Sequence, residues 1–109
     1  MSAAGFYFDP DGTGMAVFLG STEARIMEIA WREQEVTVKQ VLASWERQPV
    51  PAYTTVMTIL RRLAEKGLLE RRKRHRYHVY APAVARETFV RQRLARIREC
   101  LSRNFGDQD

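Results

Sequence analysis

Residues 52–69 read AYTTVMTILRRLAEKGLL, and this stretch decides the fold. Four apolar residues recur in it at spacings of three and four, namely Val56, Ile59, Leu60 and Leu63. This periodicity predicts an amphipathic helix over residues 53–66, with an apolar stripe about 100° wide. Gly67 follows at the position where glycine commonly ends a helix in left-handed backbone.

The side of this helix away from the apolar stripe is uncharged at its start and basic further along. Its members are Thr54, Thr58, Arg61 and Arg62, with Thr55 and Met57 on the flanks. Threonine is a poor helix former, so a helix face with several threonines favours a role in contact with a partner. Hydroxyl groups can approach base edges, and arginine can bind phosphate or guanine. We therefore interpret these six residues as candidate DNA contacts.

Downstream of Gly67 the hydrophobic period changes from that of a helix to that of a strand. Two strands are predicted over residues 68–73 and 76–81, joined around Arg74 and His75 and ended by Pro82. We assign four cations of this hairpin chiefly to DNA phosphates: Arg71, Lys73, Arg74 and Arg76. Residues 51–81 hold eight basic and two acidic residues, whereas the whole chain has a net charge of +5. A basic block of this kind predicts a surface that binds a polyanion.

Two shorter helices precede the decisive stretch. The first begins with Ser21 as the expected N-cap and has an apolar stripe that ends at Trp31. The second begins with the capping-box pattern of Thr37 and Gln40 and must end before Pro49. Three helices followed by a basic hairpin predict a mainly helical winged helix-turn-helix over residues 19–82. Both tryptophans, Trp31 and Trp45, are expected in the core.

A further helical pattern over residues 84–104 predicts a dimerisation helix within the segment 83–109. Its apolar residues form a short seam flanked by arginines, and the candidate dimer contacts are Phe89, Val90, Leu94, Ile97 and Leu101. Residues 1–18 form an N-terminal extension in this interpretation. We expect its apolar side chains to pack on the dimer helices, namely Phe6, Tyr7, Phe8, Val17 and Phe18.

Composition excludes several classes of protein. The lone cysteine, Cys100, excludes an internal disulfide framework and a cysteine-based zinc site, and we expect it to be a small buried apolar residue. His75 and His78 have no third ligand in view, so no metal or cofactor is expected. No apolar run is long enough to cross a membrane, and the N-terminus lacks the pattern of a secretory signal. No catalytic arrangement is visible, so an enzyme is not expected.

The stretch 52–58, together with Lys66-Gly67-Leu68-Leu69 and Tyr80-Ala81-Pro82, resembles the penicillinase-repressor family (BlaI/MecI/CopY) over roughly residues 19–82. The resemblance implies a bacterial, cytoplasmic, homodimeric transcriptional repressor that binds palindromic operators with TACA/TGTA-type half-sites. Recognition would be carried by Thr54, Thr55, Thr58 and Arg62. In the antibiotic-responsive members, a membrane sensor-protease triggers cleavage of the repressor, so the resemblance also implies a membrane sensor-protease or its downstream protease as a partner.

The sequence departs from the family pattern at several positions. His75 stands where glycine usually forms the wing turn, which leaves the wing geometry open. Ala85 stands where Ser or Asp often caps the C-terminal helix. The cysteine pairs of copper-responsive members are absent, so copper sensing is not expected. Only 27 residues follow Pro82, which leaves room for one dimer helix instead of several.

Two other functions remain open at this point. The winged fold could be a protein-interaction module whose basic face serves solubility, or a regulator that responds to a small-molecule effector. Binding to duplex DNA that weakens with salt would distinguish a DNA-binding protein from the interaction module.

Overall fold

A computed structural model describes residue 8 and residues 14–105 of the chain. Three helices, α1 (Ser21–Glu33), α2 (Val38–Ala43) and α3 (Tyr53–Glu65), follow a short 3-10 turn, η2 (Gly14–Val17). The antiparallel strands β1 (Leu69–Arg74) and β2 (Tyr77–Pro82) form the hairpin that we call the wing, and α4 (Arg86–Asn104) completes the order. The predicted mainly helical, winged helix-turn-helix fold is confirmed.

The helix ends follow the local chemistry of the sequence. At the start of α2, the Gln40 N–H donates to Thr37 Oγ1 and the Thr37 N–H donates to Gln40 Oε1, so the predicted capping box is confirmed. Gly67 has a φ of +85° after the end of α3, a conformation that glycine adopts without steric cost. The N-cap of α1 is Gly20 and not Ser21, which is the first helical residue, so that prediction was wrong by one position.

The wing is a six-residue ladder with a tight turn. Its register pairs Leu69 with Pro82 and Arg74 with Tyr77, so both strands begin and end one residue later than predicted. His75 lies in the turn with a φ of 54°. Histidine enters the left-handed region more readily than most residues, so the chain turns here without the glycine usual in the family.

The core lies where α1, α2, α3 and the base of the wing meet. Val56, Leu60 and Leu63 of the α3 stripe are fully buried, and Ile26 and Met27 of α1 pack in the same cluster. Trp31 is buried, as predicted, whereas Trp45 is partly buried and packs against the edge of this cluster.

The core extends into the segment before α1. Met15 and Phe18 are 5% and 7% exposed and belong to the same apolar cluster. Phe8 is 45% exposed. Phe6, Tyr7 and the side chain of Val17, which we expected on the dimer helices, lie outside the described part of the structure.

The first turn of α4 is anchored in this core. Phe89 is 1% exposed, with its ring centroid 6.2 Å from that of Phe18 and 5.8 Å from that of Trp31. Phe89 therefore packs within its own chain, which corrects its predicted place in the dimer seam. On a helix, Phe89 lies about 140° around from Leu94, so the two side chains cannot share one face.

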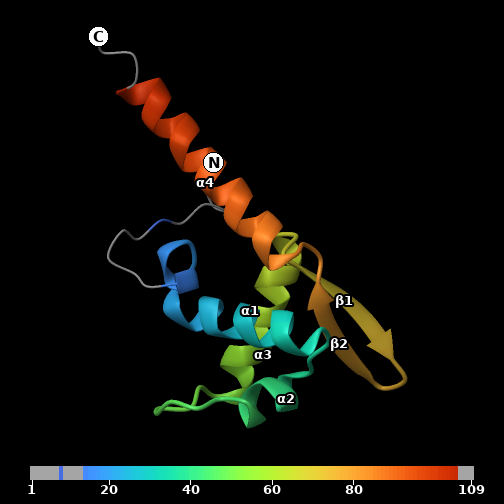
Figure 1. The fold of residues 1–109 in the computed structure, drawn as a ribbon. Helices are drawn as coiled ribbons and strands as arrows, with labels where there is room; N and C mark the ends of the chain where they lie inside the picture. Colours follow the sequence, from blue (N-terminus) through green and yellow to red (C-terminus); the bar gives the residue numbers. More distant parts are fainter. Residues whose placement is uncertain (1–7, 9–13, 106–109) are drawn as a thin grey trace.

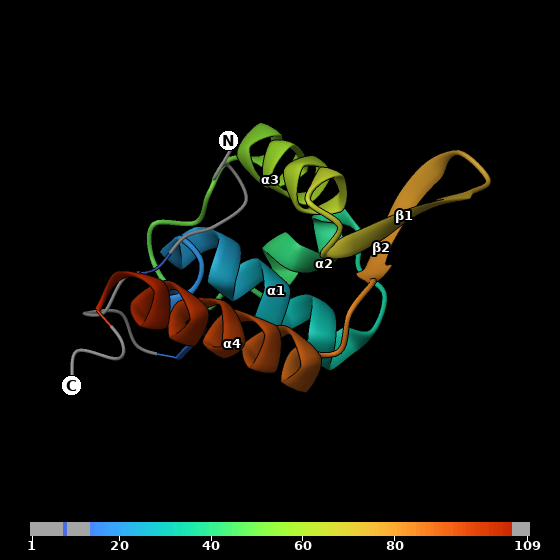
Figure 2. The ribbon, with the colours of Figure 1, turned by 90° about the horizontal axis from the view of Figure 1, so that it is seen from above.

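Figure 1 shows the wing and α4 leaving the helical body in different directions, which gives the molecule its extents of 58 × 29 × 24 Å. In Figure 2, α3 and α4 lie on opposite sides of α1. The outward face of α3 and the length of α4 are therefore separate surfaces.

Candidate nucleic-acid interface

The outward face of α3 is available to a partner. Thr54, Thr55, Arg61 and Arg62 are exposed, and Met57 and Thr58 are half-buried. These are the six residues predicted from the sequence, and the helix holds them on its surface because Val56, Leu60 and Leu63 occupy the buried side. The surface has hydroxyl and apolar groups at the start of the helix and guanidinium groups towards its end.

The cations of β1 divide between the two faces of the wing. Arg71 and Lys73 alternate with Arg72 and Arg74, and successive side chains on a strand point to opposite faces. All four are exposed. Arg76 follows in the turn and is exposed as well. The structure therefore places every predicted wing cation at the surface, on two faces and not on one.

On one of those two faces, the arginines form ion pairs with carboxylates of the same chain. Glu35, which lies between α1 and α2, contacts Arg72 at 3.3 Å and Arg74 at 2.5 Å. Glu70 contacts Arg72 at 2.7 Å. The hydrogen bond to Glu70, and then the charges of Glu70 and Glu35, raise the pKa of Arg72 above its usual range. Arg72 was absent from the predicted contacts, and only the folded hairpin brings Glu35 to it.

A groove of about 540 Å³ lies between α2, α3 and β2, beside the predicted contacts Met57 and Arg76. Sequence reasoning missed most of its polar and aromatic lining: Thr37, Lys39, Tyr53, Tyr77 and His78. Tyr53 and Tyr77 are 50% and 52% exposed, so two phenol rings stand at the surface of a basic region. Exposed tyrosines next to threonine and lysine suit a sugar-phosphate strand. In the sequence, the only sign of these two tyrosines was their position: Tyr53 begins the predicted helix, and Tyr77 follows the predicted turn.

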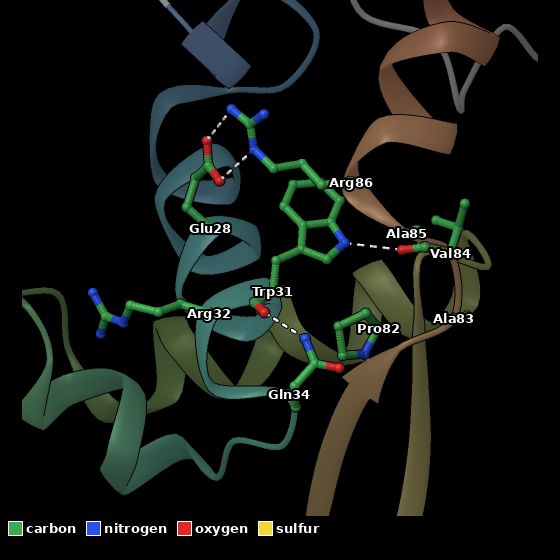
Figure 3. Close-up of a pocket in the computed structure, with 9 residues that line it drawn as sticks. All are labelled: Glu28, Trp31, Arg32, Gln34, Pro82, Ala83, Val84, Ala85 and Arg86. Atoms are coloured by element: carbon green, nitrogen blue, oxygen red, sulfur yellow. Dashed lines mark hydrogen bonds and ion pairs between the residues drawn. The ribbon is translucent and has the colours of Figure 1, made fainter.

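A second hollow, of about 600 Å³, lies where the wing passes into α4 (Figure 3). Arg86 binds Glu28 through two hydrogen bonds of 2.9 Å, and the Trp31 Nε1–H donates to the Val84 carbonyl at 2.9 Å. The bond to Glu28 raises the pKa of Arg86 above its usual range. These contacts tie α1 to the start of α4, where Ala85 provides no side-chain cap. The hollow is open, and we interpret it as the junction that sets the direction of α4.

The outer face of α4 carries apolar side chains that are largely exposed. Leu94 and Leu101 are 45% and 53% exposed, and Phe105, beyond the helix end, is 67% exposed. Val90 and Ile97 are partly buried against the core. Cys100 is exposed, so the prediction that it is buried was wrong for the protomer.

Within residues 8 and 14–105, no group of three or more His, Cys, Asp or Glu side chains could hold a metal ion. None of the described helices is long and apolar enough to cross a membrane.

Three helices and a basic wing define a winged helix-turn-helix protein, and the outward face of its third helix is uncharged at its start and basic towards its end. A family model described as penicillinase repressor matches residues 19–106, so the chain belongs to the penicillinase-repressor family. This confirms the resemblance noted in the sequence. The description of that model, penicillinase repressor, is that of a regulator of gene expression and not of an enzyme.

Curated relatives agree with this assignment. The chain is 41% identical over 73 residues to the transcriptional regulator BlaI of Mycobacterium tuberculosis, in strains CDC 1551 / Oshkosh and ATCC 25618 / H37Rv; the match covers 66% of this chain and 53% of the relative. It is 24% identical over 72 residues to the penicillinase repressor of Bacillus licheniformis, and this match covers 66% of this chain and 56% of the relative. The chain thus spans about half the length of the curated relatives that it matches.

Proposed function

We propose that this chain is a homodimeric repressor that binds a palindromic DNA operator and blocks transcription by occupying a promoter in the bacterial cytoplasm. The observation that carries the proposal is the exposed threonine face of α3, set beside a cationic wing. The family name and the names of the relatives support repression.

The dimensions of α3 suit the major groove. A helix of 13 residues is about 20 Å long, and the major groove of B-DNA is about 12 Å wide. Thr54, Thr55 and Thr58 would meet base edges, where a hydroxyl group can hydrogen-bond and a methyl group can pack on thymine. Met57 lies on the flank, and Arg61 and Arg62 would reach a guanine edge or a phosphate further along the groove.

The wing supplies affinity in this proposal, and α3 supplies selectivity. Arg71, Lys73, Arg74 and Arg76 would contact phosphates, which fix the register of the protein without reading sequence. The groove beside Tyr53 extends this phosphate-binding track towards the start of α2. We propose residues 19–82 as the DNA-binding unit on these grounds.

The outer face of α4 would join two chains. Two copies of Leu94 and Leu101 would bury each other, and the half-buried Val90 and Ile97 would complete the seam. A two-fold dimer presents two copies of α3, so the DNA site should be an inverted repeat. Dimerisation through α4 is therefore part of the same proposal.

Fluorescence anisotropy of a labelled mixed-sequence duplex, measured at increasing salt, tests the DNA-binding part. When lysine and arginine side chains bind DNA phosphates, they release the counterions condensed on the DNA. The logarithm of the binding constant should therefore fall linearly with the logarithm of salt concentration. An affinity that does not change with salt, or no binding, would contradict the proposal and favour a protein-interaction module.

A further inference from the structure

Glu35 occupies a defined place at the base of the wing. Its neighbour Val36 pairs with Tyr80 of β2, with the Val36 N–H donating to the Tyr80 carbonyl at 2.9 Å and the Tyr80 N–H donating back at 2.8 Å. A single antiparallel bridge thereby joins the connection between α1 and α2 to the edge of β2. This pairing holds the Glu35 backbone beside the wing, on the face that also presents Arg72 and Arg74.

The carboxylate of Glu35 is shared by two wing arginines. Its Oε2 accepts from Arg72 Nη1 at 3.3 Å and from Arg74 Nη2 at 2.5 Å. Arg72 also donates to Glu70 Oε1, from Nε at 3.0 Å and from Nη2 at 2.7 Å. For Arg74, the pair with Glu35 is the ion pair that the structure records among the described residues. Loss of the Glu35 charge would therefore change Arg74 more than Arg72.

The pair draws Arg74 back from the tip of the wing. Arg74 lies opposite Tyr77, next to the turn, whereas Glu35 adjoins the bridge to Tyr80, three residues along β2. Three residues of strand span about 10 Å. The Arg74 side chain thus runs along the wing towards the body, and the guanidinium group of an arginine free of Glu35 could instead extend beyond the turn.

We propose that Glu35 is an internal competitor for DNA phosphate, which holds Arg74 in the free protein and gives it up when duplex DNA binds. The proposal rests on the proposed function. Carboxylate and phosphate oxygens accept the same hydrogen bonds from a guanidinium group, so one can replace the other. The side chains of Glu35 and Arg74 are 38% and 48% exposed, and exposed ion pairs are weak enough for a phosphate to displace.

The competition has a consequence for selectivity. Each phosphate contact strengthens binding to all duplexes alike, whatever their sequence. By occupying Arg74, Glu35 lowers this general affinity. A larger share of the binding free energy then comes from the threonine face of α3, which distinguishes one sequence from another. Glu35 would therefore act on DNA binding without touching DNA.

The test compares Glu35→Gln with Glu33→Gln, using anisotropy of a labelled duplex of mixed sequence, about 20 base pairs long. Glu33→Gln is a matched control because it removes the same charge two residues away. The ion pair of Glu33 is with Arg32 and not with the wing. We expect Glu35→Gln to bind the duplex two- to tenfold more tightly than Glu33→Gln at low salt. In an Arg74→Ala background, the difference between the two variants should disappear.

Several results would overturn the proposal. If wild type binds with the expected salt dependence but Glu35→Gln binds no more tightly than Glu33→Gln, Glu35 is not a competitor, and the proposed function still stands. A sharply lower urea midpoint for Glu35→Gln than for Glu33→Gln would make Glu35 a structural support of the wing. If wild type itself fails to bind duplex DNA, the proposed function fails and this proposal fails with it.

Discussion

Thr58 is near the centre of the outward face of α3, and its position makes it a candidate reader of bases. It lies one helical turn after Thr54, and it is half-buried while Val56 and Leu60 face the core. A contact with a base edge discriminates between sequences, whereas a contact with phosphate does not.

We therefore expect Thr58→Ala to lose about 1–2 kcal/mol of preference for a selected operator over random duplex. The measurement is the ratio of the two dissociation constants at one salt concentration. Thr22→Ala, a half-buried threonine of α1, is the matched control and should leave the ratio unchanged. An equal loss on operator and random DNA would contradict the role of Thr58.

Lys73 represents the other kind of contact. It is exposed on the wing face that does not carry Arg72 and Arg74, so no exchange with Glu35 complicates its effect. We expect Lys73→Ala to weaken binding to operator and random duplex by a similar factor and to reduce the slope of the salt dependence by about 1. Arg103→Ala, at the far end of α4, is the control that should not change the slope.

At the scale of elements, α4 has two faces with different tasks. Phe89 packs against Phe18 and Trp31, whereas Leu94 and Leu101 point away from the body. The first face joins the helix to its own protomer, and the second is the one that we propose for contact with another copy.

Leu94→Asp tests the outer face. A carboxylate at an apolar seam must be desolvated against a second copy of itself, so we expect the variant to sediment as a monomer at concentrations where wild type is a dimer. Gln92→Asp adds the same charge about 160° around the helix and should leave the dimer intact. An unchanged dimer for Leu94→Asp would place the interface elsewhere.

Phe89→Ala tests the inner face. Removing a fully buried ring leaves a cavity, and we expect the free energy of unfolding to fall by about 3–5 kcal/mol in urea denaturation. Tyr77→Ala removes an aromatic ring that is 52% exposed and should change stability by less than about 1 kcal/mol. Similar losses in the two variants would contradict the anchoring of α4 through Phe89.

The elements were largely predictable because their signals are local. The capping box at Thr37, the stripe of α3 and the glycine after it each depend on residues within a few positions of one another. Phe89 was misassigned because a periodic pattern shows that a helix has an apolar face but not which neighbour covers it. Phe18, the residue that does so, is 71 positions away in the sequence.

The same distinction applies to the site. The threonines and arginines of α3 could be named from their helical phase alone. The contact of Glu35 with Arg74 could not, because it joins residues 39 apart and depends on the bridge from Val36 to β2. Cys100 was expected inside because it adjoins the seam, but in the protomer its side chain is exposed, and the later part of α4 projects away from the helical body (Figure 1).

At the scale of the whole molecule, the proposed recognition face and the proposed dimer face lie on different elements. α3 and α4 are on opposite sides of α1, and the contacts of Arg86 with Glu28 and of Trp31 with Val84 fix the start of α4 against α1 (Figures 2 and 3). In a two-fold dimer, this junction would set the distance between the two copies of α3. The spacing of the two DNA half-sites would then follow from the protein geometry.

Selection of bound duplexes from a pool of random DNA tests this account most directly. It should enrich an inverted repeat whose half-site centres lie a whole number of helical turns apart, about 10 base pairs or a multiple. Thr58→Ala in the same selection should relax the bases within each half-site and leave their spacing unchanged. Enrichment of no sequence, or of a single half-site without symmetry, would contradict a dimer that reads DNA through α3.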